Sequence, residues 1–124
     1  MKKISSLCVF IFGLGFTTLS QAQQLSATQQ HGQEVFNKWC APCHGAVAGG
    51  VLGGLGANDL PGTSALAVKY KGDLPKLIEE RTDLQPIYIR TIVRTGLYGM
   101  PITRKTEVND ADLEAIIAYL TRAR

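Results

Sequence analysis

The chain has 124 residues, a length that suits a single domain, with 13 Lys and Arg against 10 Asp and Glu. Lys2 and Lys3 lie near the start, so a chain without residues 1–22 would carry 13 − 2 − 10 = +1. A charge so close to neutral gives no case for nucleic-acid binding.

The first 22 residues have the pattern of a secretory signal. A basic start precedes an almost uncharged apolar stretch, residues 4–19, and Ser20-Gln21-Ala22 then places small residues where a signal peptidase reads them. We therefore predict cleavage after Ala22, a mature domain of residues 23–124, and export to the periplasm. The alternative is an uncleaved membrane anchor, for which the apolar run is short. We expect no membrane span in the mature form.

Helical spacing of apolar residues dominates the mature chain, and strand alternation is nearly absent, which predicts an all-α fold. The first helix is expected from about Thr28, as its N-cap, to Cys40. Gly32 interrupts it at a cost of about 1 kcal/mol, which a close contact with another helix would explain. Residues 45–62 are expected to form an extended loop.

Short helices are expected over residues 64–70, ending at Lys71-Gly72, and over residues 75–80. A further helix should open at Pro86 and run from Ile87 to Arg94, where Gly96 ends it in a left-handed conformation.

The last helix has the clearest signals. Asn109 is a good N-cap, and Val108 and Leu113 are spaced for a hydrophobic staple. Apolar residues then recur at i, i+3, i+4 and i+7, namely Leu113, Ile116, Ile117 and Leu120. Basic residues at the C-terminus, Arg122 and Arg124, suit the dipole of this helix.

A mature domain of 124 − 22 = 102 residues has a small core, and the whole chain holds only 1 + 4 + 4 = 9 aromatic residues beside 13 glycines. A bulky apolar cofactor would supply the core that the side chains lack.

The motif that carries chemistry is Cys40-Ala41-Pro42-Cys43-His44, a C-x-x-C-H sequence typical of c-type haem attachment. Two thiols form thioethers with the two vinyl groups of haem, and the adjacent histidine reaches the iron. Cys8 would leave with the signal, so Cys40 and Cys43 are the cysteines of the mature chain. Export agrees with this prediction, because c-type haem is attached outside the cytoplasm.

Other uses of the two cysteines remain open. A disulfide between them would close too small a loop to stabilise the fold much, and a thioredoxin-like site needs a βαβ context. A structural zinc site needs four ligands. Adjacent Cys43 and His44 could hardly share one tetrahedral ion, even with His31 as a further donor. The short motif could also arise by chance.

The second axial ligand of the iron would come from His31 or Met100. His31 lies nine residues before Cys40 on the same expected helix, which argues against its reaching the other side of a haem. Met100 lies in Gly99-Met100-Pro101 between two helices, where the flanking residues can fix the loop. We therefore predict Met100, although a loop methionine also fills gaps in cores. Met/His ligation raises the reduction potential of a haem.

The sequence resembles class I c-type cytochromes from Gly32 to Tyr119. Gly32 and Phe36 precede Cys40 at steps of four, and Ile116 and Tyr119 match an apolar and an aromatic position of that family's last helix. The resemblance implies helices wrapped around one covalently bound haem c, with the first and last helices crossing near the glycine.

Two details of that resemblance concern single residues. The family often has a Pro after the haem histidine whose carbonyl accepts the imidazole N–H, and the nearest candidate here is Pro61. Basic residues could pair with haem propionates or an acidic partner, or simply be solvated, and Arg94 is the preferred propionate neighbour. The four considered are Arg90, Arg94, Arg104 and Lys105.

A narrower resemblance is to the cytochrome subunits of flavin-dependent 4-alkylphenol oxidisers such as p-cresol methylhydroxylase and eugenol hydroxylase. It rests on Leu60-Pro61-Gly62-Thr63, Tyr70-Lys71-Gly72, Glu80-Arg81-Thr82-Asp83-Leu84 and Arg104-Lys105-Thr106-Glu107. It implies a periplasmic electron carrier that takes electrons from an FAD-containing flavoprotein subunit and passes them to a downstream acceptor. The alternatives are a freely diffusing carrier for another dehydrogenase, a haem enzyme or sensor with an open sixth site, and a thiol-disulfide protein without haem.

Overall fold

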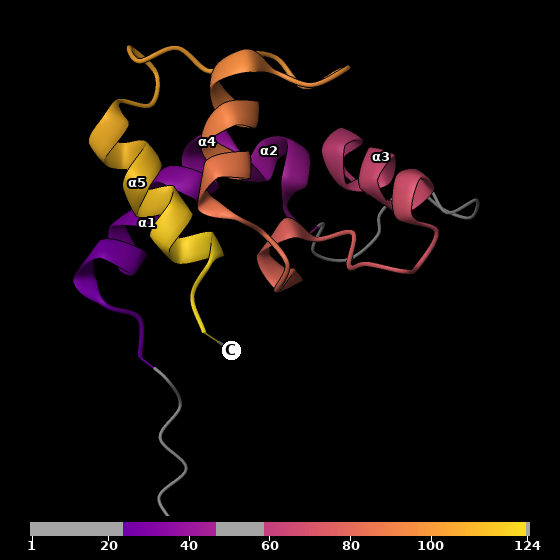
Figure 1. Ribbon diagram of the computed structural model, residues 1–124, viewed down its shortest axis with the longest axis horizontal. Helices are drawn as coiled ribbons and strands as arrows, with labels where there is room; N and C mark the ends of the chain where they lie inside the picture. The colour runs from indigo at the N-terminus through magenta and orange to yellow at the C-terminus, as the bar shows by residue number, and fades with distance from the viewer. Residues whose placement is uncertain (1–23, 47–58, 124) are drawn as a thin grey trace, which may run out of the picture.

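The computed structural model describes residues 24–46 and 59–123. The predicted signal, residues 1–22, and most of the predicted glycine-rich loop lie outside those ranges. Within them the chain is helical, and the β-type contact there is an isolated bridge between Leu97 and Met100. The elements in chain order are α1 (Ala27–Trp39), α2 (Ala41–His44), α3 (Pro61–Tyr70), the 3₁₀ turn η1 (Ile78–Glu80), α4 (Pro86–Thr95) and α5 (Asp110–Leu120) (Figure 1). The predicted all-α fold is confirmed.

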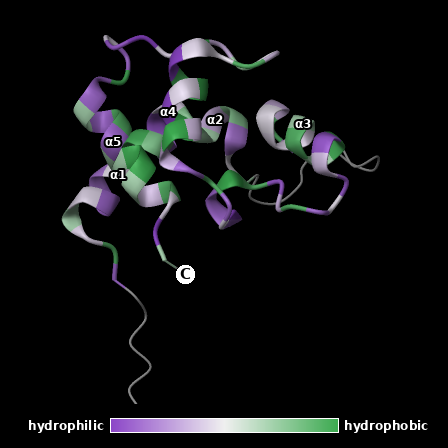
Figure 2. Cartoon of the chain, in the orientation of Figure 1, coloured by the Kyte–Doolittle hydropathy of each residue, from purple (hydrophilic) through white to green (hydrophobic). Residues whose placement is uncertain are grey.

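The core lies where α1, α4 and α5 meet (Figure 1). Phe36 of α1 is fully buried, and its ring lies 5.8 Å from that of Tyr119 on α5. Figure 2 colours much of α5 as hydrophobic. All four apolar residues predicted to form the stripe of the last helix are buried, namely Leu113, Ile116, Ile117 and Leu120.

Gly32 allows α1 and α5 to approach closely. A Cβ at this position would lie 2.0 Å from the carbonyl oxygen of Ala115, which is backbone of α5. The predicted close helix contact is therefore confirmed, and it explains a glycine inside a helix.

The helix ends agree with the sequence prediction only in part. α1 is capped by Ser26, whose hydroxyl accepts from the Gln29 N–H while the Gln29 side chain accepts from the Ser26 N–H. The prediction of Thr28 as the cap was wrong, because this reciprocal pair satisfies two backbone donors at a cap two residues earlier.

The middle of the chain also differs from the prediction. α3 begins at Pro61 rather than residue 64, since a proline at the first helical position loses no hydrogen bond. It ends at Lys71 and Gly72, which have φ of +50° and +96° as predicted for a helix stop. The predicted helix over residues 75–80 is reduced to the single turn Ile78–Glu80.

The last two helices agree closely with the prediction. α4 ends at Gly96 with φ of +71°. Asn109 caps α5, where its side chain accepts from the Asp112 N–H at 2.8 Å, and the staple residues Val108 and Leu113 are both buried. No helix in the described part of the chain is both long and apolar enough to cross a membrane.

Candidate cofactor site

A cavity of about 530 Å³ lies beside the core. Its wall comes from the end of α1, from α2, α3, η1, α4 and α5, and from the segment after α4. This volume lies within the range of about 300–1,000 Å³ that is usual for cofactor and ligand sites. The wall is mostly apolar, and it includes Cys40, Cys43, His44 and Met100.

One helical turn places both thiols at this cavity. The Cys40 carbonyl accepts from the N–H groups of Cys43 and His44, at 3.0 and 2.9 Å, and so begins α2 where α1 ends. Residues three apart in such a turn lie on one face. The two cysteines are free thiols, without a disulfide between them. Burial, together with nearby Cys43, raises the pKa of the Cys40 thiol to about 11, which keeps that thiol neutral at pH 7.

His44 ends α2 and packs against the start of α3. A Cβ on Gly62 would lie 2.6 Å from Cε1 and 2.7 Å from Nδ1 of the imidazole, so only glycine fits beside this ring. The Thr63 hydroxyl donates to the Gly45 carbonyl at 3.2 Å and holds α3 in place. Burial lowers the pKa of His44, which favours the neutral imidazole that binds metals.

The Nδ1 atom of His44 is buried and has no hydrogen-bond partner among the described residues. Pro61 lies on the cavity wall, but its carbonyl accepts no hydrogen bond from His44 Nδ1. The predicted role of Pro61 is therefore absent from this structure, and the backbone of Gly62 occupies the neighbouring space.

Met100 and His31, the two candidates for the second axial ligand, lie in different places. Met100 ends a reverse turn that two backbone hydrogen bonds close. The Leu97 N–H donates to the Met100 carbonyl at 3.1 Å, and the Met100 N–H donates to the Leu97 carbonyl at 2.9 Å. Met100 lines the same cavity as His44. His31 is exposed and makes a 2.7 Å contact from Nε2 to Asp112 Oδ1. The structure thus brings Met100, rather than His31, to the cavity.

The sequence prediction missed a polar corner of the cavity. Arg81 is only 6% exposed, its Nε donates to Asp83 Oδ1 at 2.9 Å, and its guanidinium lies over the Tyr70 ring, 4.5 Å from the centroid. Tyr70 and Lys69 line the same part of the wall. The hydrogen bond from Arg81 lowers the pKa of Tyr70. Arg81 belongs to the segment Glu80-Arg81-Thr82-Asp83-Leu84. No pattern among its neighbours in the sequence indicated that its side chain would be buried.

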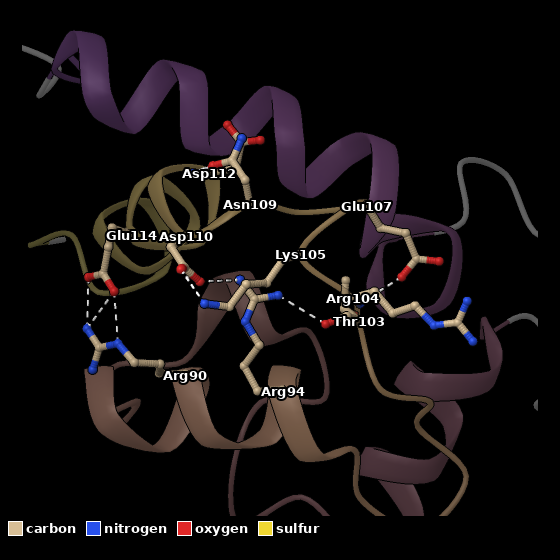
Figure 3. A network of polar contacts seen from close by, with 10 residues as sticks. All are labelled: Arg90, Arg94, Thr103, Arg104, Lys105, Glu107, Asn109, Asp110, Asp112 and Glu114. Atoms are coloured by element: carbon tan, nitrogen blue, oxygen red, sulfur yellow. Dashed lines mark hydrogen bonds and ion pairs between the residues drawn. The ribbon is translucent and has the colours of Figure 1, made fainter.

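The four basic residues singled out in the sequence lie off the cavity wall. Arg94, the preferred propionate neighbour, donates to the Thr103 carbonyl at 3.0 Å and to Asp110 Oδ1 at 2.9 Å (Figure 3). Arg90 pairs with Glu114 on α5. Arg94 thus lies away from this cavity, and among the described residues the cations at its wall are Lys69 and Arg81.

The residues on the wall fit a haem. A haem combines an apolar macrocycle, two vinyl groups, two carboxylates and an iron that accepts nitrogen and sulfur ligands. The cavity offers an apolar wall, two thiols one turn apart, a corner with two cations, a neutral imidazole and a thioether. The other uses of the cysteines gain no support within residues 24–46 and 59–123, which contain no cluster of His, Cys, Asp and Glu able to hold a metal ion and no βαβ unit.

Comparison with protein families agrees with this fit. The family model described as "Cytochrome C oxidase, cbb3-type, subunit III" matches residues 27–120, which run from the first residue of α1 to the last of α5. Comparisons with curated proteins and with solved structures found no match. The chain therefore belongs to this family of cytochrome c domains, and it is a class I c-type, haem-binding cytochrome of electron transfer.

Proposed function

We propose that the chain holds one haem c, joined by thioethers from Cys40 and Cys43, with His44 and Met100 as axial ligands of the iron. The observation that carries this proposal is the cavity that these four side chains share, although Met100 lies far along the sequence from the other three. When bound, the haem supplies one-electron chemistry at its iron.

The residues of the chain support this chemistry in separate ways. The cysteines anchor the ring, and burial keeps the His44 imidazole neutral and able to bind iron. A thioether in the sixth position raises the reduction potential and leaves no open site for oxygen chemistry. The apolar wall limits contact with water, and Lys69 and Arg81 offer positive charge to the propionates.

Spectra of the purified protein test the site. Acid-acetone extraction should leave haem with the chain, whereas the Cys40→Ala/Cys43→Ala double variant should lose it. The ferric protein should show the Met–iron charge-transfer band, and Met100→Ala should abolish the band and lower the reduction potential. A high-spin ferric spectrum of the unmodified protein would instead indicate an open sixth site, as in a haem enzyme or sensor.

For the partner, we propose an FAD-containing flavoprotein that oxidises 4-alkylphenols, with this chain as its electron-accepting subunit in the periplasm. Two observations support a lasting complex. Large apolar side chains stay exposed at or beside the cavity mouth, with Tyr88 at 44% and Tyr98 at 96% exposed. Arg90 and Arg94 are already paired with carboxylates of the same chain, which weakens the case for a partner held mainly by charge.

Native size-exclusion chromatography of a source-cell extract, reading haem and flavin absorbance together, tests the partner. Co-elution at a stable ratio across salt concentrations is expected for a dedicated flavoprotein subunit. Haem that elutes alone at the size of a small monomer would indicate a freely diffusing carrier. Haem that elutes with a terminal oxidase would favour the role that the family description names.

The predicted signal over residues 1–22 underlies the proposed export. Mass spectrometry of the purified protein should give a chain that begins at Gln23 and carries one haem. An N-terminus that retains the apolar stretch would instead favour the membrane anchor.

A further inference from the structure

The segment that carries Met100 leaves α4 and returns to it. We call residues 96–103 the Met100 loop. At its start the Gly96 N–H donates to the Ile92 carbonyl at 2.8 Å, and at its end the Thr103 N–H donates to the Val93 carbonyl, also at 2.8 Å. Both ends of the loop are thus hydrogen-bonded to the last turn of α4.

A third contact at this base comes from a side chain. Arg94 Nη1 donates to the Thr103 carbonyl at 3.0 Å, and Nη2 donates to Asp110 Oδ1 at 2.9 Å (Figure 3). Asp110 also accepts from Lys105 Nζ at 2.6 Å, so its carboxylate is held from two sides at the start of α5. The Arg94 side chain is 20% exposed, which makes its contacts less screened than those of a fully solvated pair.

The backbone inside the loop is tightly constrained as well. Gly96 has φ of +71° and ψ of 171°, a region that essentially only glycine adopts. A Cβ there would lie 2.7 Å from the Met100 carbonyl oxygen. Tyr98 also has a positive φ, +51°, within the turn that Leu97 and Met100 close. The position of Met100 thus depends on how the whole loop is held.

We propose that Arg94 is a positioning residue for Met100: by closing the base of the Met100 loop it sets the strength of the bond between the thioether and the haem iron. The inference rests on the proposed axial ligation by Met100. It also gives Arg94 a role toward the haem that involves no contact with the propionates.

The physical argument is one of populations. The thioether binds iron only while the loop holds its closed form, so the effective strength of the bond scales with the fraction of chains in that form. Arg94 makes one charge-assisted hydrogen bond to the loop, to the Thr103 carbonyl, which the open form lacks, and Asp110 orients the guanidinium that makes it. Loss of the bond to Thr103 should weaken the Met–iron bond about tenfold.

Imidazole titration of the ferric holoprotein measures this bond, because imidazole must displace Met100 to bind. Arg94→Gln should raise the apparent imidazole affinity about tenfold. Arg90→Gln is the matched control: Arg90 lies one turn earlier on α4 and pairs with Glu114 of α5, but it makes no hydrogen bond or ion pair with the Met100 loop (Figure 3). Its imidazole affinity should equal that of the unmodified protein, even if both variants lose similar thermal stability.

Arg94→Lys separates charge from loop closure and serves if Arg94→Gln loads haem poorly. A lysine keeps the charge but cannot bind the Thr103 carbonyl and Asp110 as one rigid fork. We expect an imidazole affinity between those of the unmodified protein and Arg94→Gln. An affinity equal to that of the unmodified protein in Arg94→Lys, or equal affinities in Arg94→Gln and Arg90→Gln, would overturn the inference.

The Met100→Ala spectrum distinguishes this failure from failure of the proposed ligation. If the ferric charge-transfer band is present and Met100→Ala removes it, Met100 is the ligand, and equal titrations of the arginine variants refute only the role of Arg94. If the band is absent from the unmodified protein, the proposed ligation itself is wrong and the role of Arg94 fails with it.

Discussion

Replacing Gly32 with alanine perturbs the closest approach of two helices in the fold. The added Cβ would lie 2.0 Å from the Ala115 carbonyl oxygen and 2.4 Å from the carbonyl carbon. Ordinary contact begins at 3.4 Å, so α1 and α5 would have to separate by up to 3.4 − 2.0 = 1.4 Å at their crossing. The obstructing atoms belong to helix backbone, so a change of side-chain rotamer cannot relieve the clash.

The expected cost follows from this geometry. Extra volume in a packed core costs about 1–3 kcal/mol, and a clash with rigid backbone argues for the upper end. The higher helix propensity of alanine offsets about 1 kcal/mol. Separation would also loosen Phe36 and Tyr119, both at most 2% exposed. We therefore expect the free energy of unfolding to fall by about 2 kcal/mol or more.

Denaturant unfolding of the haem-loaded protein, followed by far-ultraviolet circular dichroism, measures this loss. Gly72→Ala is the control, because Gly72 has φ of +96° and nothing within 4 Å of an added Cβ. It should cost about 1 kcal/mol from backbone strain alone. A Gly32→Ala protein as stable as the unmodified one, or more stable than Gly72→Ala, would show that the crossing of α1 and α5 accommodates an added Cβ.

Two further predictions concern pairs of polar side chains. The Arg81 guanidinium holds the pKa of Asp83 below its usual value, so the stability from this pair is fully present above about pH 4 and is lost as pH falls through the lowered pKa. Asp83→Asn should lower the free energy of unfolding by about 1–2 kcal/mol at pH 7. It should also make that free energy fall less steeply as the pH drops below about 4. Denaturant titrations at several pH values that give both proteins the same dependence on pH would refute this. His31→Ala should leave the ferric spectrum and the reduction potential unchanged, because the exposed His31 pairs with Asp112 away from the cavity. Loss of the charge-transfer band would instead place His31 at the iron.

Features that depend on neighbours in the sequence could be predicted. The start of α5 could be predicted from its cap, Asn109, and its staple, Val108 and Leu113, because both motifs involve residues close together in the sequence. Ser26 and Gln29 carry the same kind of signal for α1, since a hydroxyl residue followed three positions later by glutamine can form a capping box. The prediction of Thr28 as the cap did not take this pair into account. Better use of local patterns would have corrected that boundary.

Features that depend on distant parts of the chain could not be predicted. Gly32 indicated a close contact between helices, but no residue near it in the sequence identified Ala115 as the partner. Arg94 finds its carboxylate sixteen residues along the chain only because α4 packs beside α5. Arg81 is buried because η1, α3 and the end of α5 lie around it. Residues adjacent to Arg81 in the sequence do not indicate that these elements come together.

The candidate ligands show both kinds of feature. Cys40, Cys43 and His44 fall within one turn, so their spacing alone predicted the motif. Met100 was chosen over His31 from loop chemistry, and the structure places it on the same cavity wall. Its role as a ligand remains a prediction that the spectra above test.

Burial is distributed unevenly around the cavity. The large buried apolar side chains of the described residues lie on α1, α4 and α5 and at Val108, whereas α3 buries only Thr63 and exposes Val68 at 73%. Among these elements α3 packs mainly against the four-residue helix α2. The apolar residues that α3 turns toward the cavity, Ala65 and Leu66, would be covered by haem rather than by other side chains.

Loss of the haem should therefore free α3 and spare the helix crossing, because local stability follows the apolar contacts that each segment makes. In the haem-free Cys40→Ala/Cys43→Ala variant, amide hydrogen exchange should remain slow at Phe36 and Ile116 and become fast throughout α3. The haem-loaded protein is the reference, and its amides should exchange slowly in α1, α3 and α5. Amides of α3 that stay as protected as those of α5 without haem would mean that the protein part of the cavity is stable by itself. Haem would then fill a cavity formed in advance instead of completing the core.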